Sequence, residues 1–282
     1  MIRLNSSPDL EKRHVEAVTN RIKKSFDEAL ILTDIQKLGA NNIEDFLLAD
    51  VDTLRTWVSN SPEFLQFTAF KDMYSRFFSN GVDRYVDGDY NAYTFIRGLG
   101  VYVCPYCDDE YIDIVERDGK DKRTSEVDHF FPKSKYPALA MCFYNLVPCG
   151  QVCNGLKMEN ELGSNPYELN IEMLTFIYPD LPIGIALSQI EPSVCVPKFH
   201  PRKGMIKNVE LLTLEQRYSR HAPLAHRLLL NLQLYSSEKI DELVRMGYGS
   251  REHIISTMFG PQDATEKQRS LHQKMIRDMT EY

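Results

Sequence analysis

The sequence predicts an α+β protein in which a small core with β-strands lies between two mainly helical regions. In the first hundred residues, and again beyond Val209, apolar residues recur at the spacing of amphipathic helices. Between these regions, "YIDIVERDGKDKRTSEVDHF" alternates apolar and polar residues around "DGKD", which is typical of a β-hairpin. We therefore expect a helical region at 1–100, a core at 101–170 and a mixed, then helical, region at 171–282.

Two amphipathic stretches define the first helical region. "RHVEAVTNRIKKSFDEALIL" has its apolar residues at helical spacing, and "EFLQFTAFKDMYSRFFSNG" ends on a glycine that can cap a helix. The second stretch carries an aromatic stripe, and such a stripe is more often core than a ligand-binding face. We assign it to packing; its members are Phe64, Phe67, Phe70, Tyr74, Phe77 and Phe78.

The last region changes from loops to helices. The proline-rich "YPDLPIGIALSQIEPSVCVPKF" suggests strands and loops. Further on, Ser237 before "EKIDELVRM" and Gly247 after it bracket one helix, and Ser250 before "REHIISTMF" caps another. Between them and Val209, "HAPLAHRLLLNLQLY" holds more leucines than one buried stripe of a helix can take. We expect either a helix buried on most sides or a second apolar face that meets a partner.

Charge and composition restrict the class of protein. The chain has 33 basic and 40 acidic residues, and its net charge of −7 argues against a protein that coats nucleic acid non-specifically. Residues 117–135 reverse this balance locally, with six basic residues against four acidic ones. The first residues lack the apolar core of a signal peptide, and no apolar run approaches the ~18–20 residues of a membrane helix. We therefore expect a cytoplasmic protein with no membrane segment.

Four of the six cysteines form two closely spaced pairs. "VCPYC" places two residues between Cys104 and Cys107, and "PCGQVCN" places three between Cys149 and Cys153. Without a secretion signal, paired cysteines suggest metal binding before disulfides. The two pairs can close one tetrahedral zinc site, with free core thiols as the alternative. The other two cysteines are expected in the core as small hydrophobic residues: Cys142 and Cys195.

The stretch "EVDHFFPKSKYP" places an acid and a histidine side by side, Asp128 and His129. Alone, such a pair indicates a strand end with a solvated acid and a core histidine. Here it follows the first cysteine pair and precedes Asn145 in "FYNLVP" and Asn154 directly after the second pair. In this order the elements resemble the HNH endonucleases of the ββα-metal class, in the branch with a four-cysteine zinc site. The resemblance covers about residues 100–170 and implies a structural Zn²⁺ on the cysteine pairs.

The resemblance also implies roles for individual residues. In the family, the acid before the histidine and the last His or Asn position hold a catalytic Mg²⁺ (or Mn²⁺), which here are Asp128 and Asn154. Mg²⁺ prefers oxygen donors and keeps several waters, so that few protein ligands suffice. His129 would act as the general base toward the attacking water. Asn145 would fix the loop that carries this base, with an ordinary turn asparagine as the alternative.

Three lysines near these residues are candidates for phosphate contacts, although each also fits an ordinary surface lysine: Lys133, Lys135 and Lys157.

We favour DNA over RNA as the substrate. The phrase "DHFFPKSKYPALAMCFYNLVP" is similar to HNH proteins of bacterial anti-phage defence islands, including the nuclease subunit of Septu-type systems, which works with an ATPase. This similarity implies an ATPase subunit as partner, and a homo-oligomer is the alternative.

Two other functions fit parts of the sequence. A zinc-stapled module could bind nucleic acid or act as a scaffold without catalysis, but it would be expected to lack the Asp, the His or the second Asn, and this sequence keeps all three. A cysteine enzyme could pair Cys142 or Cys195 with His129, but neither cysteine lies in a recognisable nucleophile motif. The sequence therefore favours a metal-dependent nuclease.

Overall fold

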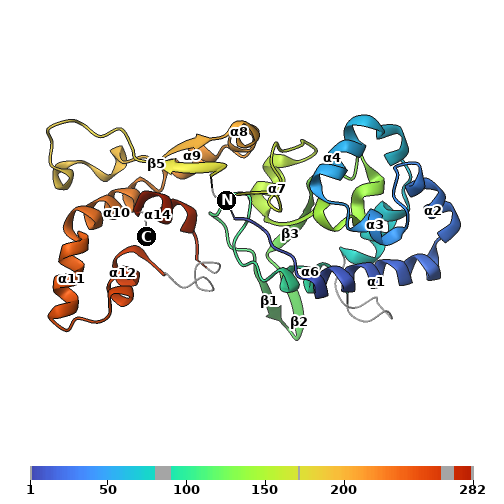
Figure 1. The fold of residues 1–282 in the computed structure, drawn as a ribbon, viewed down its shortest axis with the longest axis horizontal. Coiled ribbons are helices and arrows are strands. Elements are labelled where there is room, and N and C mark those ends of the chain that lie inside the picture. Colours follow the sequence, from blue (N-terminus) through green and yellow to red (C-terminus); the bar gives the residue numbers. More distant parts are fainter. Residues whose placement is uncertain (1, 80–89, 171, 262–269, 281–282) are drawn as a thin grey trace. The chain divides into compact units, whose positions relative to one another are not determined.

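The computed structural model describes residues 2–79, 90–170, 172–261 and 270–280. Across these residues, helices are combined with three small antiparallel sheets of two strands each (Figure 1), which agrees with the predicted α+β class. None of the helices in these ranges has both the length and the apolar character needed to cross a membrane.

Contacts divide the chain into two compact units. The first consists of residues 3–106 and 111–169, and the second of residues 1–2, 107–110 and 170–282. In the described residues the first unit holds two of the sheets, and the second holds the third. The helices before residue 100 therefore pack in the same unit as the strands that carry the Asp-His pair.

Most helices of the first unit are capped by polar side chains. The stretch "RHVEAVTNRIKKSFDEALIL", whose apolar residues recur at helical spacing, belongs to two helices divided at Phe26, because the Asp27 carboxylate accepts a hydrogen bond from the Leu30 amide and starts a new helix. The helices in this part are α1 (Pro8–Ser25), α2 (Glu28–Gln36), α3 (Ile43–Leu47), α4 (Val51–Asn60), α5 (Ala69–Met73) and α6 (Ala92–Leu99).

The aromatic stripe belongs mainly to the core, as predicted. Phe70, Tyr74 and Phe78 are buried, and only Phe64 of the stripe is clearly exposed, at 39%. Helix α5 continues into a π-helical turn at Tyr74–Phe78. The glycine expected to cap this stretch, Gly81, lies outside the described residues.

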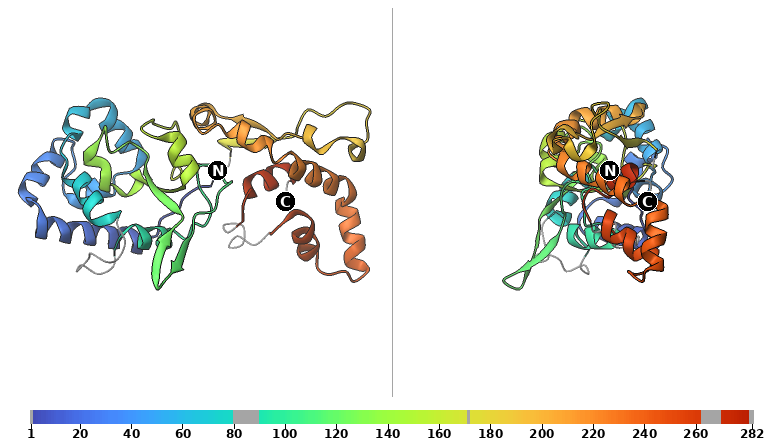
Figure 2. Two further views of the ribbon diagram at one scale, coloured as in Figure 1. Left: turned by 180° about the vertical axis from the view of Figure 1, so that it is seen from behind. Right: turned by 90° about the vertical axis from the view of Figure 1, so that its left-hand side faces the viewer.

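The predicted β-hairpin is present and projects from its unit in both views of Figure 2. Strands β1 (Ile114–Arg117) and β2 (Lys120–Arg123) pair antiparallel around Asp118 and Gly119. Both turn residues have positive φ angles, 56° and 69°, as a two-residue hairpin turn requires. The Asp-Gly pair therefore fixes the register of this hairpin.

A second strand pair and one helix form the part that carries the Asp-His pair. Strand β3 (Ser125–His129) pairs antiparallel with β4 (Leu146–Gly150), and helix α7 (Gln151–Lys157) follows β4 without a break. The chain between the strands contains two 3₁₀ turns, Pro137–Met141 and Phe143–Asn145. Helix α7 packs on both strands, so that residues at the end of β3 face residues of α7.

The second unit contains strands β5 (Leu174–Ile177) and β6 (Lys198–Pro201), joined by a loop with two 3₁₀ turns, Leu187–Gln189 and Pro192–Val194. Its helices in the described ranges are α8 (Lys203–Leu211), α9 (Leu214–Ser219), α10 (Ala222–Leu234), α11 (Ser237–Arg245), α12 (Arg251–Phe259) and α14 (Gln273–Thr280). Ser250 caps α12 as predicted. The cap of α11 was predicted one residue late, because Ser236 and not Ser237 accepts from the Lys239 amide.

The leucine-rich helix α10 combines buried, half-buried and exposed residues. Leu228 and Leu229 are buried, Leu230 and Leu232 are half-buried, and Leu234 is 63% exposed. Both arrangements expected from the sequence, a helix buried on most sides and a second apolar face that meets a partner, stay predictions.

His14 joins helix α1 to the interior of the first unit. Its side chain is completely buried, with Nε2 2.7 Å from the Met141 carbonyl and Nδ1 2.9 Å from the Tyr90 hydroxyl. A carbonyl oxygen only accepts, so that Nε2 carries the proton and Nδ1 accepts from Tyr90. Burial lowers the pKa of His14 to about 4, against a weaker opposing effect of the Met141 carbonyl.

We predict that His14 makes the first unit less stable in acid. The pKa of His14 is about 4 in the fold and 6.5 in the unfolded chain, so that only the unfolded chain gains a proton as the pH falls from 7 to 5. The expected loss is about 2 kcal/mol of unfolding free energy. Urea unfolding followed by the fluorescence of Trp57, the single tryptophan and a buried residue of the same unit, measures this loss.

A His14→Gln variant should lose that part of the pH dependence, whereas a variant of the exposed His253, His253→Gln, should keep it. Parallel stability curves for wild type and His14→Gln would contradict the assignment.

Candidate functional site

Asp128 and His129 line one cavity at the end of β3. The cavity has a volume of about 580 Å³, and Asn154 of α7, Lys133 and Glu126 also line it. Neighbouring residues on a strand point to opposite faces, but β3 ends at His129, so that the cavity extends around the end of the strand. The structure thus brings together the acid, the histidine and the second asparagine that the sequence singled out.

The Asp128 carboxylate is held from both sides inside the protein. Its side chain is 6% exposed, Oδ2 accepts a hydrogen bond from the Tyr106 hydroxyl at 2.7 Å, and Oδ1 lies 3.1 Å from the Lys157 ammonium. Burial and the nearby Asp128 charge raise the pKa of Tyr106 well above its usual value, which keeps this hydroxyl a donor. The direction of the carboxylate is therefore fixed.

Lys157 is fully buried, and its ammonium also donates to the His129 carbonyl at 2.7 Å. One cation of α7 thus holds both residues of the Asp-His pair, Asp128 by its side chain and His129 by its backbone. The sequence suggested a phosphate contact for Lys157. In the structure the ammonium has no exposed surface, so that it acts on Asp128 and His129 instead.

The His129 ring is fixed in one tautomer by the backbone. Its Nε2 lies 3.1 Å from the Ala140 carbonyl, which only accepts, so that Nε2 carries the proton and Nδ1 keeps its lone pair. The edge of the Tyr74 ring lies against the imidazole at a centroid distance of 4.4 Å, and the Tyr74 hydroxyl donates to the Val127 carbonyl. Burial, and then the charge of Lys133, lower the pKa of His129 well below 6.5, so that the ring is neutral.

Asn145 clamps the loop between β3 and β4. Its Oδ1 accepts from the Phe131 amide at 2.7 Å, and its Nδ2 donates to the carbonyls of Phe131 and Leu139 at 3.2 and 2.9 Å. The side chain is completely buried, and all of its partners are backbone groups. These contacts fit the support role that the family resemblance implies better than an ordinary turn asparagine.

Asp128 and Asn154 offer oxygen donors to the same cavity. A carboxylate oxygen has two lone pairs, and each oxygen of Asp128 uses only one in the hydrogen bonds to Tyr106 and Lys157. The remaining lone pairs and the Asn154 amide oxygen form the kind of donor set that Mg²⁺ and Mn²⁺ prefer. The residues therefore fit a catalytic divalent ion.

The other two candidate lysines differ in exposure. Lys133 lines the cavity, and its ammonium lies 5.0 Å from the centre of the Tyr74 ring. Lys135 is exposed outside the residues that line the cavity. Of these two candidates, Lys133 is thus the one that can reach an anion inside the cavity.

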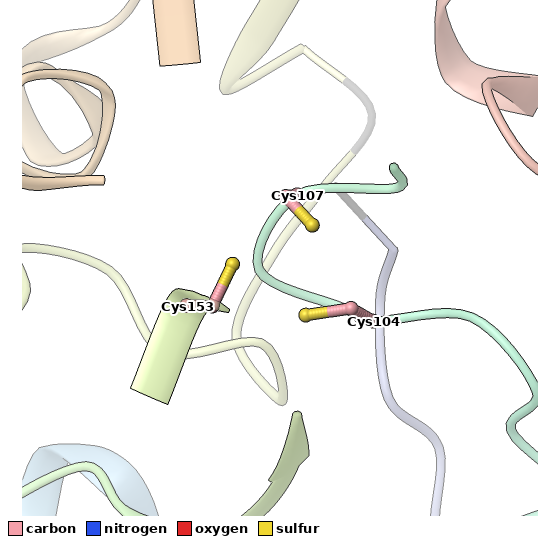
Figure 3. A group of neighbouring side chains, drawn as sticks. All are labelled: Cys104, Cys107 and Cys153. Carbon is pink, nitrogen blue, oxygen red and sulfur yellow. The ribbon is translucent and has the colours of Figure 1, made fainter. Parts of the chain in front are cut away.

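Three of the four paired cysteines converge on one point (Figure 3). The Sγ atoms of Cys104, Cys107 and Cys153 all lie within 4.8 Å of one another, and the three side chains are buried. Figure 3 shows the sulfur atoms directed toward a common centre, with Cys153 at the start of α7. Thiolates are the donors that Zn²⁺ prefers in structural sites, so that this group fits a zinc ion.

Cys149, the fourth predicted ligand, is buried on β4 but is not part of this group. Burial, and then the nearby Asp128, raise the pKa of its thiol well above 9. The two unpaired cysteines, Cys142 and Cys195, are buried as expected, and the Cys142 thiol donates to the Phe46 carbonyl. The structure therefore brings three of the four predicted zinc ligands together, and the place of Cys149 stays a prediction.

Comparison of the chain with protein-family models, with curated proteins and with solved structures gave no match.

We predict that Lys157→Met destabilises the first unit by about 3–5 kcal/mol, because it leaves the buried Asp128 carboxylate without its cation. Denaturant unfolding followed by Trp57 fluorescence measures the change. Adding Asp128→Asn should recover a large part of the loss, since the double variant no longer holds a buried charge without a partner at this place. Lys135→Met removes an exposed lysine and serves as the control. If the loss of unfolding free energy in the double variant equalled the sum of the losses in the two single variants, the ion pair would have no energetic role.

For the cysteine group, we predict that Cys153→Ser lowers the zinc content of the purified protein by one ion per chain. Cys142→Ser removes a thiol that is equally buried but lies outside the group, and it should leave the zinc content unchanged. Elemental analysis after dialysis against a chelator measures both. Cys149→Ser tests the fourth ligand predicted from the sequence, since a ligand variant should lose zinc as Cys153→Ser does.

Proposed function

We propose that this chain is a metal-dependent HNH endonuclease of the ββα-metal class, which hydrolyses phosphodiester bonds of nucleic acid, with DNA as the favoured substrate. The observation that carries the proposal is the cavity at the end of β3, where Asp128, His129 and Asn154 meet. The strand–strand–helix order of β3, β4 and α7, with Cys153 of α7 grouped with Cys104 and Cys107, supports the same assignment.

The donors in the cavity suit the hydrolysis of an anionic ester. Asp128 and Asn154 would hold a Mg²⁺ or Mn²⁺ ion, whose charge offsets the negative charge that builds up on the phosphoryl and leaving oxygens. The Lys133 ammonium lies in the same cavity and can bind a further phosphate oxygen. Lys157 fixes the direction of the Asp128 carboxylate without touching the substrate.

His129 has the tautomer that a general base needs. Its Nε2–H is bound to the Ala140 carbonyl, so that Nδ1 is free of a proton and can accept one from the attacking water. The hydrogen bond to Ala140 remains in place when Nδ1 gains the proton, and it then stabilises the imidazolium. Asn145 holds the loop from Phe131 to Leu139 and thereby the carbonyl at Ala140.

The cysteine group would have a structural role in this enzyme. The part formed by β3, β4 and α7 is small, and a Zn²⁺ ion on Cys104, Cys107 and Cys153 would fix the start of α7 to the "CPYC" segment. Tyr106, which holds Asp128, lies within that segment. A structural ion would therefore stabilise the direction of the catalytic carboxylate.

A non-catalytic, zinc-stapled module that binds nucleic acid or serves as a scaffold is the second candidate. The ion pair between Lys157 and Asp128 favours it, because a carboxylate that already faces a buried cation can have a purely structural role. The two candidates differ in the expected effect of His129, which is essential for cleavage but unnecessary for a staple.

The wider setting also belongs to the proposal. Similarity to HNH proteins of bacterial anti-phage defence islands suggests an effector that acts with an ATPase subunit or as a homo-oligomer. The exposed apolar residues near the end of α10 and after α11, Leu234, Met246 and Tyr248, offer contact surface for such a partner.

We predict that His129→Ala lowers cleavage by about 10²–10⁴-fold, because it removes the general base. Plasmid DNA, single-stranded DNA and RNA are incubated with the protein, alone and with a candidate ATPase, in the presence of Mg²⁺ and with the ion chelated. His226→Ala, a histidine far from the cavity in sequence and not among its lining residues, should cleave as wild type does. Asp128→Ala and Asn154→Ala should shift the Mg²⁺ dependence to higher concentration. If His129→Ala, with unchanged zinc content, cleaved as fast as the wild-type protein, the proposed mechanism would be wrong.

A further inference from the structure

A second group of metal-binding side chains lies in the second unit, and the nuclease proposal does not use it. His221 and His272 both direct Nε2 at the same oxygen of Asp109, Oδ1, and each nitrogen lies 2.7 Å from it. The centroids of the two imidazole rings are 4.0 Å apart. Asp109 comes from the loop after Cys107, His221 precedes α10 and His272 precedes α14. Three distant segments of the chain thus meet at one carboxylate oxygen.

The geometry is close to that of a metal site. The three ligand atoms all lie within 4.8 Å of one another. Zinc–nitrogen and zinc–oxygen bonds of about 2.0–2.2 Å in a tetrahedral site place neighbouring ligand atoms about 3.3 Å apart. Moving each nitrogen away from Oδ1 by less than about 1 Å makes room for the ion. Side-chain rotation alone can supply such a movement.

The second carboxylate oxygen of Asp109 is held by arginines. Arg220 donates to Oδ2 at 2.6 Å, and Arg217 lies 3.7 Å from the same atom. A carboxylate that binds a metal through one oxygen commonly accepts a hydrogen bond at the other, which fixes its direction. The arginines therefore leave Oδ1, the oxygen shared by the two imidazoles, as the ligand atom.

The backbone around the group is fixed in an unusual conformation. Asp108 and His272 both have positive φ angles, 57° and 60°, which is uncommon for residues other than glycine. The His272 amide donates to the Asp108 carbonyl at 2.9 Å, and the Lys274 amide donates to Asp108 Oδ2 at 2.8 Å. Such conformations persist where the surroundings hold them, and they concentrate at functional sites.

Two imidazole nitrogens with one carboxylate oxygen match the preferences of borderline first-row divalent ions such as Zn²⁺, and not those of Mg²⁺ or Ca²⁺. The side chains of His221 and His272 are 16% and 14% exposed, so that water can reach the group and occupy a fourth position. We propose that Asp109, His221 and His272 form a second metal site, distinct from the cysteine group, that takes Zn²⁺ or a similar ion. The ion would join the start of α10 and the start of α14 to the loop at Asp109.

The test measures metal binding and not cleavage, so that its outcome is independent of the nuclease proposal. The protein is stripped with a chelator, reloaded with Zn²⁺ and desalted, and its zinc content is determined per chain. We expect His221→Gln and His272→Gln each to lower the content by one ion per chain. His226→Gln changes a histidine that is hydrogen-bonded to the Leu187 carbonyl and does not belong to the group at Asp109, and it should retain the wild-type content. Equal zinc content in all four proteins would overturn the proposal.

Cobalt distinguishes the two sites even where a variant folds poorly. Co²⁺ on thiolates gives an intense charge-transfer absorption in the near ultraviolet, whereas Co²⁺ on imidazole and carboxylate gives only weak visible bands. Titration of stripped wild-type protein should show a second equivalent of Co²⁺ that binds without further charge-transfer absorption. The Cys104→Ser/Cys153→Ser variant should still bind this equivalent, and adding His221→Gln should abolish it. A titration that ends after the thiolate equivalent, or a second ion that is lost on desalting, contradicts the site.

Discussion

The buried ammonium of Lys157 is the contact on which the geometry of the candidate active site depends. It comes from the last turn of α7 and meets two groups at the end of β3, the Asp128 carboxylate and the His129 carbonyl. A buried lysine is costly unless it is paired and hydrogen-bonded, and a buried carboxylate is costly for the same reason. Each charge is therefore tolerated only while α7 and β3 keep this relative position. The ion pair thus specifies the arrangement of strand and helix more than it adds stability.

Other polar contacts fix what the ion pair leaves free. The β3–β4 loop runs through the interior without regular strand pairing, so that its backbone groups need partners. Asn145 supplies three of these partners, and the loop in turn presents the Ala140 carbonyl that sets the His129 tautomer. On the other side, Tyr106 reaches Asp128 from between two of the converging cysteines. Asp128 and His129 are therefore each positioned by neighbours that take no part in the proposed chemistry.

Local signals made much of this arrangement predictable from the sequence. The Asp-Gly turn of the hairpin and the Ser250 cap depend on backbone conformations that only a few residue types favour, and both were predicted. The meeting of Asp128, His129 and Asn154 followed from the order of short elements within one stretch. The division of the first helical stretch at Phe26 was not predicted, because the apolar spacing continues across it and only the Asp27 cap reveals it.

Contacts between distant residues were not accessible in the same way. Lys157 appeared as a surface lysine, since the sequence does not show that its position on α7 faces β3. A signal was present, because the residue lies one turn after Asn154 and therefore on the same side of the helix. The meeting of Asp109 with His272 spans 163 residues and has no motif, so that only the fold reveals it. The three converging sulfur atoms do not include that of Cys149, so that its role as the fourth ligand stays a prediction from spacing.

The same ion pair has a consequence for the order of binding in the proposed nuclease. An ion at Asp128 would lie close to the Lys157 ammonium, which cannot move away because it is buried and also bonded to the His129 carbonyl. Like charges at short distance in a partly buried cavity repel each other appreciably. A phosphate group in the cavity adds negative charge and offsets this repulsion, and Lys133 on the cavity wall attracts the same group. The free protein should therefore hold the ion weakly, and substrate and ion should each strengthen the binding of the other. Such coupling would confine the fully assembled site to the complex with nucleic acid.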